Sequence, residues 1–440
     1  MRYFFAVLAI LLFFGCSSKE IKPKSEEIVI SDLVNLPQNI ESYTENFDDN
    51  MSLFDIQKKY DASYFRMWNV EKPKESIENI KWPFYTYANI KTFGENLQPL
   101  QKEFFDKMYE NSNFDSYATL NRRAITLKYS DLRLFPTIAP LLKDPSLAGE
   151  GFPFDYLQNS SIHANEPVLA SHYSKDGEWI YVFASFASGW IKSDRLAFIE
   201  KKYTDIWQKS KQIFITKEGQ SLFTTEGIFL YKSKIGMSFA LINEDKDNYT
   251  VLVIVACGNS KPLYKQAKIT KEIATKNVLS LNKTNLNKIM SEISKSHYGW
   301  GGIYEQRDCS SSLRDLFAPF GMWLPRNSAE QSKVGKIISL KNLADDEKIA
   351  LIKEKAIPFQ TLLYKKGHIV LYVGTYNDEI IIFHNTWGIK TIINGVEGRL
   401  VIGKTVFSTL KLGEEQENYD PNAELLKNIT SMNILTQIMQ

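Results

Sequence analysis

Cys309 is the residue whose surroundings point most directly to chemistry. It stands in the run Arg-Asp-Cys-Ser-Ser at 307–311, shortly after a glycine-rich stretch, Tyr-Gly-Trp-Gly-Gly, at 298–302. The apolar residues after Cys309 keep helical spacing, which predicts that it lies at or near the start of a helix. Free backbone N–H groups at a helix start stabilise a thiolate and lower a cysteine pKa from its ordinary ~8.5. A structural cysteine at a polar helix start would look similar.

Two of the five histidines stand on consecutive strand-like runs downstream of this cysteine. His368 lies in the run Gly-His-Ile-Val-Leu-Tyr-Val-Gly at 367–374, and His384 ends an apolar run that begins at Ile380. If the runs pair as antiparallel strands, we expect His368 to act as the general base and His384 to hold its other ring nitrogen. The alternative is that both histidines are structural residues at strand ends whose ring nitrogens are simply hydrogen-bonded.

The remaining histidines have weaker contexts. We expect His163 and His172 to be surface or loop residues, whereas His297 is adjacent to Tyr298 and could line the cleft.

These motifs resemble those of the NlpC/p60 cell-wall cysteine peptidases, which are papain-like in fold. The resemblance also uses Leu-Pro-Arg-Asn-Ser at 324–328 with Gln331 and the His-Asn pair at 384–385, and it covers about 285 to 412 directly. It implies that Cys309 is the nucleophile, His368 the base, His384 the orienting residue and Tyr298 a support for the oxyanion. It also implies that the substrate stem peptide is contacted by Asp308, Ser310 and Ser328.

The order of the preceding segments is similar to a multidomain branch of this family, whose members are γ-D-glutamyl-L-diamino acid endopeptidases. The resemblance implies a peptidoglycan hydrolase that cuts the γ-D-glutamyl–meso-diaminopimelate bond of stem peptides or muropeptides, and no metal or organic cofactor. A carboxylate at Asp308 in a partly desolvated cleft would pair with an ammonium group, which favours a free N-terminal L-Ala. Two alternatives stay open: a non-catalytic peptidoglycan-binding lipoprotein, and an amidase or D,D-endopeptidase on the same scaffold.

Composition restricts the class of protein. The 440 residues favour two to four domains, and a hydrophobic fraction of 44% with 24% charged residues is ordinary for a globular chain. Lys and Arg number 53 against 51 Asp and Glu, a formal net charge of +2, so nucleic acid is not an expected partner.

The elements that position the site are expected to form a multidomain α+β protein. Helical spacing around 97–109 gives way to short β-rich runs with turn signals such as Asp176-Gly177, and later to the apolar run 251–256. The predicted order is a signal peptide with a lipobox cysteine (1–16), a tether (17–28), a helical N-terminal domain (29–130), a first SH3-like barrel (131–211), a second SH3-like barrel (212–284), a papain-like catalytic domain (285–412) and a polar C-terminal tail (413–440).

The three cysteines cannot form a disulfide framework. The apolar run from Tyr3 to Phe14 is too short for a comfortable bilayer span and fits a signal peptide. It ends in Phe-Phe-Gly-Cys, which resembles a lipobox and predicts a lipidated Cys16, although Phe13 departs from the usual Leu and leaves ordinary secretory cleavage or an uncleaved anchor as alternatives. Each alternative predicts export to the periplasm, and Ser17 favours the outer membrane. We expect Cys257 to be a buried structural thiol.

Overall fold

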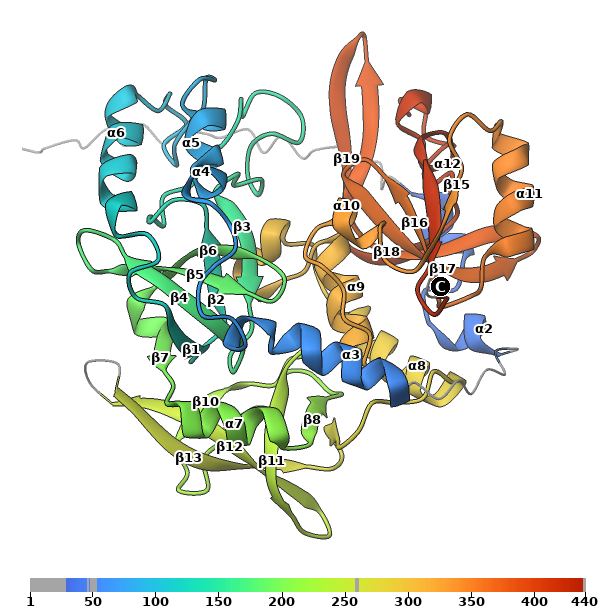
Figure 1. The fold of residues 1–440 in the computed structure, drawn as a ribbon. Coiled ribbons are helices and arrows are strands. Elements are labelled where there is room, and N and C mark those ends of the chain that lie inside the picture. The colour runs from blue at the N-terminus through green and yellow to red at the C-terminus, as the bar shows by residue number, and fades with distance from the viewer. Residues whose placement is uncertain (1–28, 46, 48–53, 258–260, 438–440) are drawn as a thin grey trace, which may run out of the picture.

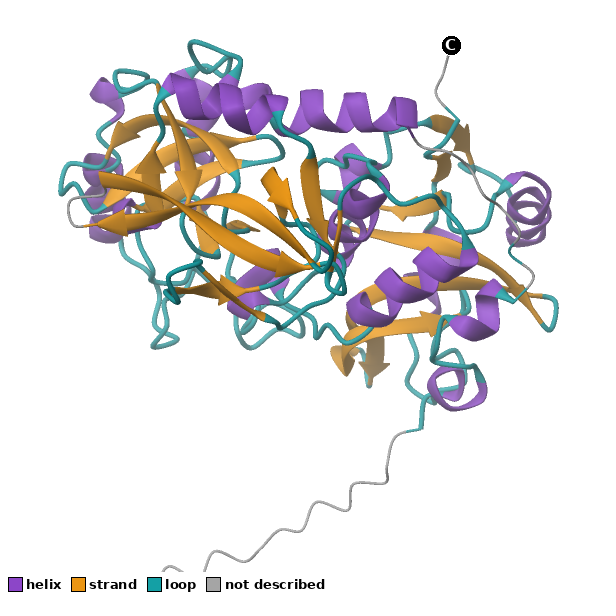
Figure 2. Cartoon of the chain, turned by 90° about the horizontal axis from the view of Figure 1, so that it is seen from below, coloured by secondary structure: helices purple, strands orange, loops and turns teal. Residues whose placement is uncertain are grey.

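A computed structural model describes residues 29–45, 47, 54–257 and 261–437. The predicted signal peptide, Cys16 and the tether lie outside these residues. The described chain has the expected multidomain α+β architecture, with two β-rich parts on one side and a C-terminal sheet domain on the other (Figures 1 and 2). Helix α9 lies where these parts meet (Figure 1). None of the helices in the described part of the chain is long and apolar enough to cross a membrane.

The N-terminal region is helical as predicted, but it is not one domain. Helices α1 and α2 pack against the C-terminal domain, whereas α4, α5 and α6 share a hydrophobic core with the first barrel. Short helices cannot bury enough apolar surface among themselves, so each uses a neighbouring domain. The helices are α1 (Ser31–Asn35), α2 (Glu41–Thr44), α3 (Phe54–Tyr64), α4 (Ile77–Ile80), α5 (Trp82–Tyr87) and α6 (Lys102–Asn111), with 3-10 turns η1 (Arg66–Trp68) and η2 (Phe114–Ser116).

The first barrel is a seven-stranded sheet in the order β3-β2-β6-β5-β4-β1-β7. Its strands are β1 (Arg122–Thr126), β2 (Ser130–Arg133), β3 (Gln158–Ile162), β4 (Pro167–Tyr173), β5 (Trp179–Ala184), β6 (Ser188–Lys192) and β7 (Leu196–Phe198), and η3 (Ser193–Arg195) precedes β7. The hairpin predicted at Asp176-Gly177 joins β4 to β5. The predicted start at 131 is wrong, because β1 pairs with both β4 and β7. This pairing joins residues far apart in the sequence, so it could not be predicted from the short run at 122–126 alone.

The second barrel follows helix α7 (Lys201–Lys209), which the sequence had assigned to the first. Its sheet has the order β13-β12-β11-β8-β14, and β9 pairs with β10. The strands are β8 (Gln212–Ile215), β9 (Ser221–Phe223), β10 (Phe229–Lys232), β11 (Ser238–Glu244), β12 (Asn248–Cys257), β13 (Lys261–Thr270) and β14 (Ala274–Thr275). Cys257 ends β12 as expected, and its side chain lies outside what the structure describes.

The C-terminal domain packs helix α9 against an antiparallel sheet in the order β15-β20-β16-β17-β18-β19. The predicted polar tail is wrong, because its segment Ser431–Ile434 forms β20 between β15 and β16. Four residues are too few to display a periodicity, yet Met432 and Ile434 are buried. The elements are α8 (Lys283–Ile293), η4 (Trp300–Glu305), α9 (Cys309–Phe317), η5 (Ala318–Phe320), α10 (Ser328–Gln331), β15 (Lys336–Ser339), α11 (Asp345–Lys355), β16 (Thr361–Lys365), β17 (His368–Tyr376), β18 (Glu379–Ile393), β19 (Val396–Ser408), η6 (Pro421–Ala423), α12 (Leu425–Asn428) and β20.

Candidate active site

Cys309 is the first residue of helix α9, as its sequence context predicts. Asp308 caps the helix: its carboxylate accepts the Ser311 N–H at 2.9 Å, and Ser311 Oγ accepts the Asp308 N–H at 2.9 Å. The thiol side chain lines a cavity of about 360 Å³ that is also lined by Tyr298, His368 and His384. The structure therefore brings the four predicted catalytic residues together around one cavity.

The thiol does not have the lowered pKa that the helix start predicts. Burial raises the pKa of Cys309 to about 12, and the neighbouring Asp308 carboxylate raises it further, while the backbone amides of Ile369 and Ser310 act in the opposite direction. Cys309 is only 9% exposed. The prediction is wrong because it counted the helix start and not the cost of placing a thiolate in a buried site next to a carboxylate. The surroundings of Cys309 therefore favour the neutral thiol over the thiolate.

The two histidines form a hydrogen-bonded relay. Strands β17 and β18 are antiparallel neighbours, as predicted. His368 Nε2 lies 2.8 Å from His384 Nδ1, and His384 Nε2 lies 3.1 Å from Ser408 Oγ. The Ser408 hydroxyl donates its proton to the Thr409 carbonyl at 2.9 Å. Ser408 is a relay residue that the sequence did not single out.

This chain of partners determines the histidine tautomers. Because the single Ser408 proton is already donated, its oxygen must accept from His384 Nε2–H. His384 Nδ1 is then an acceptor, and His368 must donate to it from Nε2–H. The Nδ1 of His368 is left unprotonated, which is the state that a general base needs.

Burial opposes protonation of both histidines. Burial lowers the pKa of His368 to about 3, and the nearby Lys365 lowers it further against the opposing effect of Asp308. Burial and the neighbouring His368 hold the pKa of His384 well below its ordinary value. Burial therefore opposes charge on both Cys309 and His368, which line the same cavity.

Tyr298 keeps its phenolic proton. Burial, followed by the nearby Cys309 and Asp308, raises its pKa well above 10. Its ring contacts Trp387, with centroids 5.7 Å apart, and Phe154 of the first barrel at 6.4 Å. A phenol held by these rings can donate a hydrogen bond to a developing oxyanion. Neither aromatic neighbour was identified from the sequence.

The three predicted substrate-binding residues are not equally placed. Asp308 forms an ion pair with Arg326 at 2.5 Å, and Ser310 Oγ donates to Asp308 at 3.2 Å and accepts from Arg326 at 3.0 Å. Ser328 begins α10 and is half-buried, and none of the three residues lines the cavity that holds Cys309. Asp308 is thus already paired, so the argument that its charge would seek a substrate amine is wrong. The ion-pair partner of Asp308 is Arg326, which lies within the motif at 324–328 and was not identified as a partner from the sequence.

The first barrel closes the Asp308 end of the site. Arg326 Nε donates to Ser160 Oγ at 2.7 Å, and Gln158 Nε2 donates to the Gly301 carbonyl at 3.3 Å. Gly302 has φ +85°, and a Cβ there would collide with Ser161 Oγ. Only glycine allows this close approach of the loop to the barrel.

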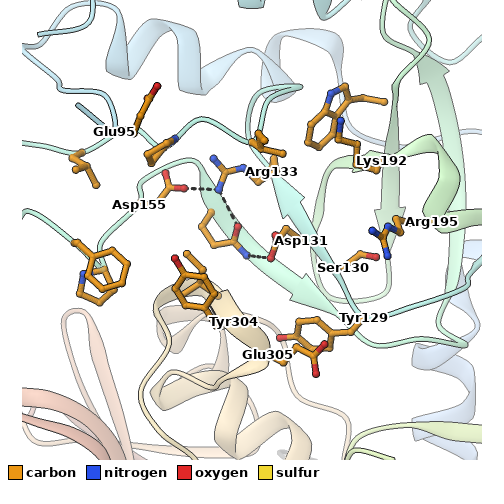
Figure 3. A pocket seen from close by; sticks show the side chains of 18 of the residues that line it. Glu95, Tyr129, Ser130, Asp131, Arg133, Asp155, Lys192, Arg195, Tyr304 and Glu305 are labelled. Carbon is orange, nitrogen blue, oxygen red and sulfur yellow. Dashed lines mark hydrogen bonds and ion pairs between the residues drawn. The ribbon is translucent and has the colours of Figure 1, made fainter. Parts of the chain in front are cut away.

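A second, larger cavity of about 660 Å³ lies on the barrel side of this loop and is not lined by Cys309 (Figure 3). A hydrogen-bonded network crosses the floor of this cavity. Asp155 forms an ion pair with Arg133, and Arg133 donates a hydrogen bond to Gln158 at 3.0 Å. Gln158 in turn donates to Asp131 at 2.8 Å. The network holds Gln158 against the glycine loop.

The other histidines lie outside the cavity. His163 is buried and contacts Asp315 at 3.0 Å, and His172 is buried in β4 with its Nε2 3.1 Å from the Ser112 carbonyl, so the surface positions expected for both are wrong. His297 is exposed and does not line the cavity. Within the described residues, no group of three or more His, Cys, Asp or Glu side chains is arranged to hold a metal ion.

Four family models match the chain in series. They are the NLPC_P60 stabilising domain, N term (5–117), the SH3 domain of SH3b1 type (140–192), the SH3 domain of SH3b2 type (201–246) and the NlpC/P60 family itself (295–400), which includes Cys309, His368 and His384. The chain belongs to the NlpC/P60 family. Membership makes this NlpC/P60 protein a cysteine endopeptidase, with peptidoglycan as its class of substrate.

A solved structure with a TM-score of 0.80 agrees with the fold of this NlpC/P60 protein. An NlpC/P60 endopeptidase from Photobacterium damselae subsp. piscicida is 22% identical, with a TM-score of 0.80 over 92% of this chain and 98% of that one. An NlpC/P60 family protein from Bacillus cereus is 15% identical, with a TM-score of 0.47 over 71% of this chain and 98% of that one. A search of curated protein sequences returned no match.

Proposed function

We propose that the protein hydrolyses the amide bond between the γ-carboxyl group of D-glutamate and the amino group of meso-diaminopimelate in peptidoglycan stem peptides. The observation that carries this proposal is the shared cavity of Cys309 and His368, with the base tautomer of His368 maintained through His384 and Ser408. The family resemblance supports the choice of bond.

The reaction begins with attack of the Cys309 sulfur on the γ-glutamyl carbonyl carbon, while His368 Nδ1 takes the thiol proton. The Tyr298 hydroxyl and the backbone N–H groups at the start of α9 stabilise the oxyanion. His368 then gives its proton to the departing amine, the C–N bond breaks, and a thioester remains. Water, deprotonated by His368, attacks the thioester, which releases the glutamyl γ-carboxyl group and restores the thiol.

We also propose a preference for peptides with a free N-terminal L-Ala. The support is steric, because the paired charge of Asp308 removes the electrostatic reason. Ser160 and Gln158 of the first barrel contact the Arg326 side chain and the glycine loop at the Asp308 end of the site. A stem peptide still joined to muramic acid would have to pass this junction.

The test uses wild type, Cys309→Ala and His368→Ala with L-Ala-γ-D-Glu-meso-diaminopimelate, its N-acetylated form and intact sacculi. Wild type should release diaminopimelate from the free tripeptide, more slowly from the acetylated one, and both variants should lose at least ~10³-fold in kcat/KM. His297→Ala, exposed and outside the cavity, is the matched control and should keep wild-type activity. Mass spectrometry identifies the bond that is cut: release of L-Ala-D-Glu supports the proposal, and products of an amidase or a D,D-endopeptidase contradict it.

We further propose that the protein is exported to the periplasm and anchored by a lipid on Cys16, with the outer membrane favoured. The support is the lipobox-like Phe-Phe-Gly-Cys sequence at 13–16 and the serine that follows it. Cys16→Ser should abolish labelling by a radioactive fatty acid and move the protein from the membrane fraction to the soluble fraction. Unchanged labelling would contradict lipidation.

A further inference from the structure

The cavity that holds Cys309 has a cationic wall. Lys365 at the end of β16, Lys390 of β18 and Arg399 of β19 all line it, together with the exposed Lys366 of the hairpin turn. Of the described residues that line this cavity, Glu424 is the one carboxylate. The wall therefore carries an excess of positive charge.

The charges of this wall are not equally neutralised. Lys390 contacts Glu397 at 2.9 Å and Asp420 at 3.2 Å, and Arg399 contacts Glu397 at 2.7 Å. Lys365 has no carboxylate within ion-pair distance among the described residues, although its side chain is half-buried. Burial, and then Arg399 and Lys390, lower the pKa of Lys365. A half-buried cation in such surroundings gains from an added anion.

Lys365 lies directly beside the catalytic base. In the ladder between β16 and β17, Lys365 is the partner of His368. The tight turn between them consists of Lys366 and Gly367, which has φ +82°. The ammonium group and the imidazole are thus held on one rigid hairpin, and a group bound by one is close to the other.

The leaving part of the substrate occupies this same side. The residues that close the Asp308 end, Ser160, Ser310 and Arg326, do not line the cavity. The proposed function directs the N-terminal L-Ala of the acyl part toward that end, so in this orientation the amine protonated by His368 leaves on the side of Lys365. In meso-diaminopimelate that amine sits on a carbon with a carboxyl group, and the far end of the residue carries a second one.

We propose that Lys365 binds a carboxylate of the leaving diamino acid, with Arg399 and Lys390 behind it, and so makes the enzyme select an anionic residue after the scissile bond. This inference rests on the proposed function for the direction in which the substrate lies. A lysine in that place would present its side-chain ammonium group to the cationic wall without the second carboxylate, whereas in meso-diaminopimelate that carboxylate accompanies the distal ammonium group.

The experiment compares wild type, Lys365→Met and Lys365→Arg on four tripeptides of the form L-Ala-γ-D-Glu-X. X is meso-diaminopimelate, its two singly amidated forms, or L-lysine. We expect Lys365→Met to lower kcat/KM on the diacid about 10- to 100-fold, the value of a charge-assisted hydrogen bond. On the amidated form that lacks the bound carboxylate, Lys365→Met should lower kcat/KM very little. The amidated form that shows this result identifies the carboxylate that Lys365 binds. Lys365→Arg should recover most of the activity.

The matched control is Lys341→Met, which removes an exposed lysine in the turn that follows β15. This variant should behave as wild type. An equal loss on all four peptides would mean that Lys365 acts only through His368, and no loss would mean that it binds nothing; either result overturns the inference. Calorimetry of the diacid and its amides with Cys309→Ala, with and without Lys365→Met, measures the same discrimination without turnover. If wild type cuts a different bond while this binding difference persists, the proposed function fails and the carboxylate site stands.

Discussion

The two barrels support the catalytic helix in different ways. The second barrel shares one continuous hydrophobic core with the C-terminal domain, and this core includes Leu313 and Phe317 of α9. The first barrel contributes Ala164 to that shared core, has two further cores that do not include α9, and touches the catalytic site through polar and aromatic contacts, such as Ser160 with Arg326 and Phe154 with Tyr298. The second barrel therefore positions the nucleophile, whereas the first shapes the cleft.

Buried charge sharpens this contrast. Arg307, directly before the helix cap, is 1% exposed and joins Glu218 of the second barrel at 3.1 Å to Asp315 of α9 at 2.8 Å. A buried ion pair is costly to break by removal of one partner. The first barrel reaches the same Asp315 of α9 through the buried His163 at 3.0 Å, and the rest of its junction consists mainly of single hydrogen bonds of about 1 kcal/mol each. Damage to the two junctions should therefore be seen in stability on one side and in activity on the other.

The largest expected effect is at the second-barrel junction. Arg307→Met leaves the Glu218 carboxylate without this partner and removes one cation from Asp315, so the free energy of unfolding should fall by about 3–5 kcal/mol. Urea denaturation followed by circular dichroism measures it. Lys217→Met is the matched control, since the Lys217–Glu272 pair is exposed and should contribute less than about 1 kcal/mol. An Arg307→Met midpoint equal to that of wild type would contradict the anchoring role of the second barrel.

An intermediate effect, mainly on activity, is expected at the first-barrel junction. Gly302→Ala forces the loop away from Ser161, which displaces Tyr298 and the Gly301 N–H that donates to Asp308. We expect kcat/KM to fall about tenfold or more and stability to fall by about 2–3 kcal/mol.

Gly177→Ala is the matched control for this test, because it distinguishes the effect of a steric contact from the effect of backbone strain. Gly177 also has a left-handed φ of +73°, but a Cβ there would meet open space. Its cost should be about 1 kcal/mol with unchanged activity. If both alanine variants lose activity equally, the loop contact does not shape the cleft.

The smallest effect concerns the buried Glu166 and the half-buried Glu218, whose pKa values shift in opposite directions. Burial raises the pKa of Glu166 in the first barrel to about 8; burial also acts to raise that of Glu218, but Arg307 overcomes it and holds the pKa below its ordinary value. Between about pH 4.5 and 8 the folded state keeps a proton on Glu166 that the unfolded chain releases, so stability falls as pH rises. Glu166→Gln removes this dependence.

Unfolding of both proteins at pH 5 and pH 8 tests this difference. Relative to wild type, Glu166→Gln should be more stable at pH 8 by on the order of 1 kcal/mol, with a smaller difference at pH 5. Parallel pH dependences for the two proteins would mean that Glu166 is ionised in the fold.

Much of the site could be predicted from local patterns. The helix start at Cys309 and the antiparallel pair that carries His368 and His384 are each encoded within a few residues, where periodicity and turn chemistry act. Tyr298 was identified through the family resemblance of the glycine-rich stretch. Strand β20, the distribution of the N-terminal helices and the burial of His163 and His172 could not be, because each depends on a partner far away in the sequence.

The sequence alone determined which groups take part: one thiol, two histidines on paired strands, and a phenol. The tertiary structure decided their ionisation and their neighbours. A helix start favours a thiolate, but a pKa depends on everything around the group, and here burial and the Asp308 carboxylate prevail. Only packing of the first barrel brought Ser160 and Phe154 to the site, and only the hairpin register placed the unpaired Lys365 beside the base.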